Sequence, residues 1–139
     1  MILYLDSLRS VRRKTLPGRL LSGMCLGKWR AHGDGYVPAI LPNPHDLTAV
    51  MRGRITASEY RRRLEGLYQG WGEEMNRPQI LSARDHADLG MVQDGDTIVC
   101  ACPRPGPQRR HLFCHLEVAA PYMAGGVMEI RLYGQLVKP

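Results

Sequence analysis

The chain has little of what membrane-spanning and exported proteins carry. Its apolar runs are only a few residues long, and Asp6 interrupts the first of them. A membrane span needs roughly 20 consecutive apolar residues, and a secretory signal needs a continuous apolar core. We therefore expect no membrane segment and a cytoplasmic protein. In that reducing compartment the four cysteines are expected as free thiols or metal ligands rather than disulfides.

Lysine is also scarce, since sixteen of the nineteen basic residues are arginine. The formal net charge is +6, and the planar fork of arginine suits phosphate and carboxylate groups. This balance favours an anionic partner such as a nucleotide or nucleic acid. A GC-rich genome would produce the same arginine bias without any functional meaning, so charge alone leaves the question open.

A length of 139 residues is enough for one hydrophobic core but too short for two. We therefore expect a single domain over residues 1–139. Apolar patterns predict strands at 2–7, 20–27, 97–102 and 127–134, and helices at 43–53, 56–70, 80–90 and 110–124. The basic stretch 7–19 is expected to be a loop, because Pro17 and Gly18 interrupt it.

Two of these helices carry clear start signals. Asn43 is a good N-cap with Pro44 behind it, and Thr56 and Glu59 have the spacing of a capping box. The order of elements predicts an α/β fold, a small open, mostly parallel four-stranded sheet flanked by helices. Such sheets bind ligands beyond the carboxyl ends of their strands.

Several segments together resemble the bacterial and phage family called domain of unknown function 488. They are a short N-terminal strand, Leu16-Pro17 before a second strand, GYVPAILPNPHDL at 35–47, the phrase RGRITASEYRRRLEGLY at 52–68, the strand DGDTIVCACP at 94–103 and the closing VMEIRLYG at 127–134. The resemblance implies an α/β fold and no agreed activity. Family members carry a Cys-His-Arg motif at a helix start. In this chain the motif falls either near Arg109 and Arg110 or on Cys114 and His115, the latter followed by Leu116 instead of arginine.

Three segments that follow predicted strands are basic, and we expect their side chains to bind a phosphate-bearing ligand, a nucleotide or nucleic acid. Trp29 among them is a candidate for stacking on a base or for pinning its loop to the core. The candidate ligand-binding residues are Arg9, Arg12, Arg13, Lys28, Trp29, Arg30, Arg104, Arg109 and Arg110.

The cysteines and histidines near the third predicted strand offer a second class of function. Cys114 is a candidate nucleophile, with His111, one helical turn earlier, as a better base than the adjacent His115. Alternatively, zinc is held by Cys100, Cys102 and Cys114, which His111 and His115 could approach from the following helix, although the spacing matches no standard zinc motif. Strand cysteines are more often plain buried hydrophobes, so we assign no cofactor. A third reading is a phage or host interaction module with a basic face.

Overall fold

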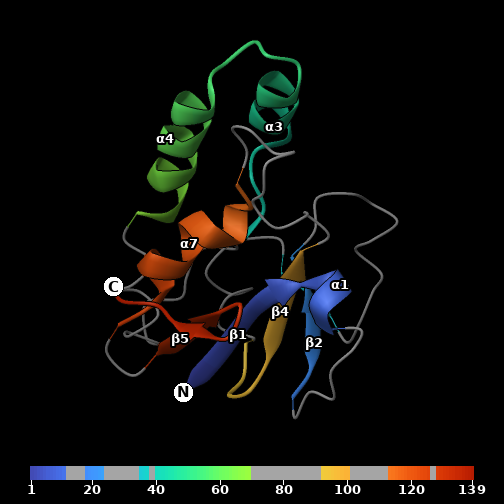
Figure 1. The fold of residues 1–139 in the computed structure, drawn as a ribbon, viewed down its shortest axis with the longest axis vertical. Helices are drawn as coiled ribbons and strands as arrows, with labels where there is room; N and C mark the ends of the chain where they lie inside the picture. Colours follow the sequence, from blue (N-terminus) through green and yellow to red (C-terminus); the bar gives the residue numbers. More distant parts are fainter. Residues whose placement is uncertain (12–17, 24–34, 38–39, 70–91, 101–112, 126–127) are drawn as a thin grey trace, which may run out of the picture.

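A computed structural model describes residues 1–11, 18–23, 35–37, 40–69, 92–100, 113–125 and 128–139 (Figure 1). Its elements follow in chain order: β1 (Ile2–Ser7), α1 (Leu8–Val11), β2 (Leu20–Ser22), β3 (Gly35–Tyr36), α3 (Pro44–Met51), α4 (Ala57–Tyr68), β4 (Thr97–Cys100), α7 (His115–Met123), β5 (Glu129–Leu132) and β6 (Gln135–Leu136).

The strands form one sheet with the order β3-β2-β4-β1-β5-β6. All neighbouring pairs are parallel except β5 and β6, which form an antiparallel hairpin. The α/β class and the mostly parallel sheet are therefore confirmed. The four predicted strands are β1, β2, β4 and β5. The two additional strands, β3 and β6, are two residues each, which is too short for an alternating pattern to reveal.

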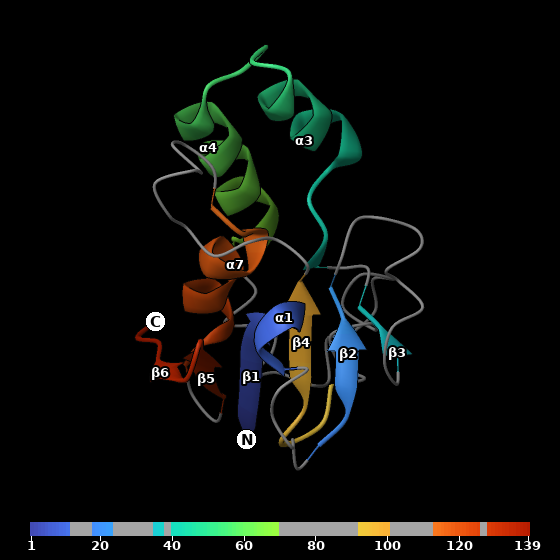
Figure 2. The same ribbon diagram turned by 45° about the vertical axis from the view of Figure 1, so that its right-hand side comes forward.

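The connections distribute the helices over both faces of the sheet. β1 leads through α1 to β2 on one side, whereas β4 leads through α7 past β1 to β5 on the other. Right-handed crossovers that run in opposite directions place their helices on opposite faces. Figure 2 looks onto the face that carries α1. On the other face α4 packs on α7, and α3 packs on α4. In both views α3 and α4 extend beyond the carboxyl ends of the strands.

A single core lies between the sheet and the helices. β1 and β4 are buried almost throughout, and α7 contributes six buried residues of its nine. The side chains with no measurable exposure include Leu3, Ile40, Tyr68, Ile98, Val99, Leu116, Met123 and Ile130. Apolar burial on this scale is the main force that holds the sheet and helices together.

Helices α3 and α4 begin as their caps predict. The Asn43 side chain accepts a hydrogen bond from the His45 backbone NH at 2.9 Å, and Thr56 accepts one from the Glu59 NH at 3.1 Å. Each bond satisfies one of the NH groups that a helix leaves unpaired at its start. Not every apolar side chain of these two helices faces the core, since Met51 is 65% exposed and Leu67 is 45% exposed.

Two local predictions were wrong. The stretch 7–19 is not all loop, because Leu8–Val11 forms one helical turn with Leu8 and Val11 buried. The predicted helix 110–124 begins only at His115, since Cys114 is an extended N-cap residue with φ −72° and ψ 139°. The predicted helix 80–90 lies outside the described residues.

Candidate functional site

The carboxyl ends of three parallel strands lie in one row. Ser7 of β1 pairs with Cys100 of β4, and Ser22 of β2 pairs with Val99. β1 and β4 are neighbours whose connections leave in opposite directions, which makes their carboxyl ends a topological switch point. In open α/β sheets this is the place where ligands bind.

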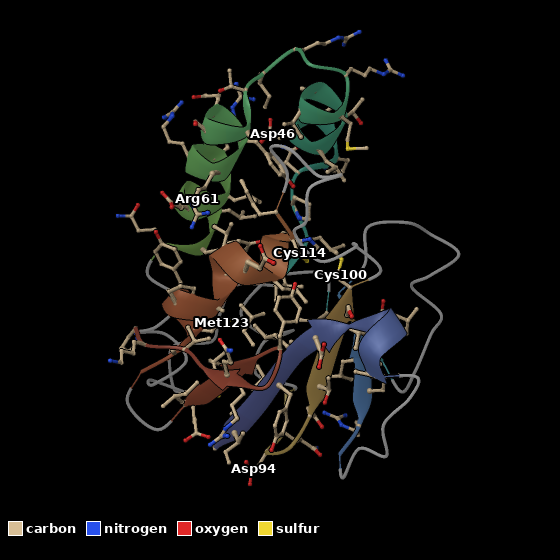
Figure 3. The ribbon with its side chains drawn as sticks, in the orientation of Figure 1. Asp46, Arg61, Asp94, Cys100, Cys114 and Met123 are labelled. Atoms are coloured by element: carbon tan, nitrogen blue, oxygen red, sulfur yellow. The ribbon has the colours of Figure 1, made fainter. Side chains whose placement is uncertain are left out.

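Cys100, Cys114 and His115 meet at this switch point. Each offers one sulfur or ring nitrogen, and these three atoms lie within 4.8 Å of one another. The side chains are 3%, 1% and 3% exposed. Figure 3 shows the two cysteines side by side where β4 ends and α7 begins. Neither of these two cysteines forms a disulfide. Two thiols and an imidazole at such distances can share a metal ion, or exchange a proton.

The His115 ring is oriented by the backbone of the neighbouring strand. Its Nε2 lies 2.7 Å from the carbonyl oxygen of Gly23, the residue that follows β2. A carbonyl oxygen only accepts hydrogen bonds, so Nε2 carries the proton and donates. In the neutral ring Nδ1 is then the nitrogen that holds a lone pair.

Gly23 can serve as a rigid partner because its own position is constrained. Its NH donates to the Val99 carbonyl at 2.9 Å. A Cβ at this position would lie 2.8 Å from Cγ2 of Ile98 and 3.1 Å from Cγ2 of Ile40. The absence of a side chain lets the end of β2 approach β4 closely.

The position of Cys114 overturns one argument from the sequence. Adjacent residues on a helix point in different directions, which made His115 seem a poor partner for Cys114. Because Cys114 is extended and only His115 is helical, the two side chains converge instead. His111 lies outside the described residues, so its role as a base for Cys114 stays a prediction. The Cys114 side chain does not cap α7.

Tyr133 and Glu117 lie close to the two thiols. Tyr133 occupies the turn between β5 and β6 with φ 51°, and its hydroxyl donates to Glu117 Oε1 at 3.0 Å. Burial, and then the negative charges of Cys114 and Glu117, raise the pKa of Tyr133 above its ordinary value. Tyr133 therefore stays protonated at neutral pH and remains a donor.

The sequence analysis did not identify Tyr133, Glu117, Asp6 or Ser7. Asp6 and Ser7 are 7% and 8% exposed, and Asp6 Oδ1 accepts the Ser7 NH at 2.8 Å. A signal was present, because two polar residues close an otherwise apolar strand at its carboxyl end. Nothing in the sequence indicates that Tyr133 reaches back to α7.

Of the predicted site residues, the structure brings Cys100, Cys114 and His115 together. Arg9 belongs to α1. The remaining predicted residues lie outside the described residues: Arg12, Arg13, Lys28, Trp29, Arg30, Cys102, Arg104, Arg109, Arg110 and His111. Their grouping around one ligand stays a prediction.

No described helix is long and apolar enough to cross a membrane. Comparison of the chain with protein-family models, with curated proteins and with solved structures gives no match. The resemblance to domain of unknown function 488 therefore stays a prediction, and the fold and the Cys100, Cys114 and His115 cluster carry the functional argument.

Proposed function

We propose that the carboxyl edge of β1, β4 and β2 binds a phosphate-bearing ligand, a nucleotide or nucleic acid. The observation that carries this proposal is the parallel register of these three strands. Ser7, Cys100 and Ser22 end in one row, so the segments that follow them all start from the same edge.

The charge of the chain supports this location. Residues 12–17 follow α1, whereas residues 24–34 and 101–112 follow β2 and β4, and the three segments carry formal charges of +3, +1 and +3. The whole chain is +6, so everything outside these three segments has a net charge of −1. The positive charge is therefore carried by these three segments, two of which directly follow the strand ends β2 and β4, and positive charge attracts phosphates.

The described arginines contribute little to a positive field, because most of them are paired with carboxylates. Their nearest nitrogen–oxygen distances are 2.6 to 3.3 Å. The paired residues are Arg19, Arg61, Arg62, Arg63 and Arg131. The run of three arginines on α4 is thus neutralised by Glu59, Glu65 and Asp46, which argues against that helix as the nucleic-acid surface.

The start of α7 adds a second favourable field at the same edge. The nine-residue helix begins immediately beyond Cys114, whose side chain does not cap it. Backbone NH groups and the helix dipole at such a start favour an anion. The strand ends, the charge distribution and the helix start therefore support one location for the ligand.

The test is the salt dependence of binding to a fluorescent single-stranded oligonucleotide and to a fluorescent nucleoside triphosphate. The double variant Arg109→Ala/Arg110→Ala should bind the oligonucleotide at least about tenfold more weakly at low salt. Two lost phosphate contacts should flatten the slope of log K against log salt by about 1.4.

The matched control is Arg61→Ala/Arg62→Ala, which removes the same charge from α4. Both of its arginines are exposed and already paired with carboxylates, so binding should stay close to that of the wild type. Equal salt slopes for the two double variants would refute the proposal. A basic face that serves an acidic protein instead would leave both nucleotide probes unbound.

A further inference from the structure

We propose that Cys100, Cys114 and His115 form a binding site for a transition-metal ion, most suitably Zn²⁺. Of the zinc ligands considered from the sequence, these three are the ones within the described residues; Cys102 and His111 lie outside them. The proposal does not rest on the phosphate-bearing ligand proposed above, although both are placed at the same strand ends.

The first support is that three donor atoms from two separate parts of the chain converge. Cys100 ends β4, whereas Cys114 and His115 begin α7, and their donor atoms are within 4.8 Å of one another. Zinc–sulfur bonds of about 2.3 Å and zinc–nitrogen bonds of about 2.0 Å place tetrahedral ligands roughly 3.5 to 3.8 Å apart. A small rotation of the side chains closes the remaining distance.

The second support is the chemistry of the donor set. Thiolate and imidazole are the ligands that Zn²⁺ prefers, whereas Mg²⁺ and Ca²⁺ prefer oxygen. Binding releases a proton from each thiol, and two thiolates with one neutral imidazole then balance the charge of a divalent ion. A neutral complex of this kind suits a position where all three side chains are at most 3% exposed.

The third support is the hydrogen bond that holds the histidine. Metal-bound histidines nearly always donate their other ring NH to a carboxylate or a backbone carbonyl. Nε2 of His115 does so to Gly23 at 2.7 Å, which assigns Nδ1 as the ligand atom. Gly23 is itself fixed against Val99 and Ile98, so the ring is oriented before any ion arrives.

Three protein ligands leave a fourth coordination position. Structural zinc sites fill all four positions with protein side chains, and catalytic sites keep one for water or substrate. The site lies at the switch point of the sheet, the position where α/β folds bind their ligands.

The test uses the full chain, reduced and without an affinity tag. Titration with Co²⁺ should produce the near-ultraviolet thiolate-to-cobalt band and the visible bands of tetrahedral cobalt, at one ion per chain. Zn²⁺ should then displace Co²⁺. Cys114→Ser and His115→Asn should each weaken Co²⁺ binding by about 100-fold. His45→Asn is the matched control, because His45 is exposed on α3 and should leave affinity unchanged.

A second measurement uses the wild-type chain and so tests the proposal even if the variants fail to fold. Zn²⁺ should protect Cys100 and Cys114 of the wild-type chain from alkylation, as located by peptide mass analysis. The proposal is overturned if the reduced chain binds neither ion, if the Co²⁺ spectrum lacks the thiolate band, or if Zn²⁺ leaves Cys100 and Cys114 equally reactive.

Discussion

Asp96 holds the amino ends of the strands together, and its replacement by asparagine should destabilise the fold without touching the candidate site. Its Oδ2 accepts bonds from Nη2 of Arg19 and the NH of Gln93, both at 2.7 Å, and its Oδ1 accepts from Arg19 Nε at 3.2 Å. The side chain of Asp96 is 2% exposed. Asp96→Asn removes the charge and turns one acceptor into a donor that faces other donors.

The magnitude follows from this geometry. Breaking a fully buried ion pair costs about 3 to 5 kcal/mol. The Arg19 side chain is 36% exposed and can be rehydrated, which lowers the expected loss to about 2 to 3 kcal/mol. For a chain of this length the loss corresponds to a decrease in Tm of about 7 to 10 °C. Urea unfolding followed by circular dichroism measures the loss in the free energy of unfolding.

The effect should depend on pH. Burial opposes ionisation of Asp96, but the hydrogen bonds from Arg19 and Gln93 outweigh it and hold the pKa of Asp96 below its usual 3.8. A carboxyl group with a lowered pKa stabilises the fold above its unfolded pKa, and loses that contribution as pH falls through the folded value. The difference between wild type and Asp96→Asn should therefore be full at pH 7 and shrink below pH 4.

Asp94→Asn is the matched control. Asp94 is exposed and accepts one bond, from the Ile2 NH at 2.6 Å, which an asparagine oxygen can also accept. This variant should lose less than about 0.5 kcal/mol. Similar losses for the two variants, or a loss for Asp96→Asn that persists undiminished in acid, would refute the reasoning.

Three further predictions concern packing and charge. Gly66→Ala, whose new Cβ meets nothing within 4 Å, should raise stability by about 0.5 to 1 kcal/mol, and Gly23→Ala should lower it by about 1 to 3 kcal/mol. If urea unfolding shows that the Gly66→Ala and Gly23→Ala substitutions change stability in the same direction, the packing described around these glycines is contradicted. Thr97→Val should stabilise by about 1 kcal/mol, because the buried hydroxyl has no hydrogen-bond partner in the described part of the chain. A lower Tm would contradict it. Glu59 should titrate with a pKa of about 2 by NMR, since Arg62 and Arg63 hydrogen-bond its carboxylate. Concentrated salt should return this pKa toward 4.5, and a normal value at low salt would disprove the pairing.

Features governed by neighbouring residues were predictable from the sequence. Asn43 and Thr56 cap their helices, and the four longer strands lie where apolar runs end at Gly, Pro or polar residues. Features governed by distant packing were not. Leu67 matches the helical period of α4, but the stripe that meets the core is the narrower one formed by Tyr60, Leu64 and Tyr68.

The candidate site shows the same limit. Cys100, Cys114 and His115 each stand out in the sequence, but their convergence depends on the extended backbone of Cys114. Residue types favour a helix over 110–124, and only the tertiary packing sets its start at His115. The Gly23 carbonyl carries no sequence signal at all, because every residue has one.

Phe113, the residue before Cys114, links the thiols to the outer helices. Its ring stacks on Tyr60 of α4 with centroids 5.8 Å apart, and the Arg61 guanidinium lies 5.2 Å from its centre. Phe113 thus joins the segment that carries the thiol to α4, and α4 in turn packs on α3. The packing of the two helices that extend past the strand ends is therefore continuous with the residue beside the candidate site.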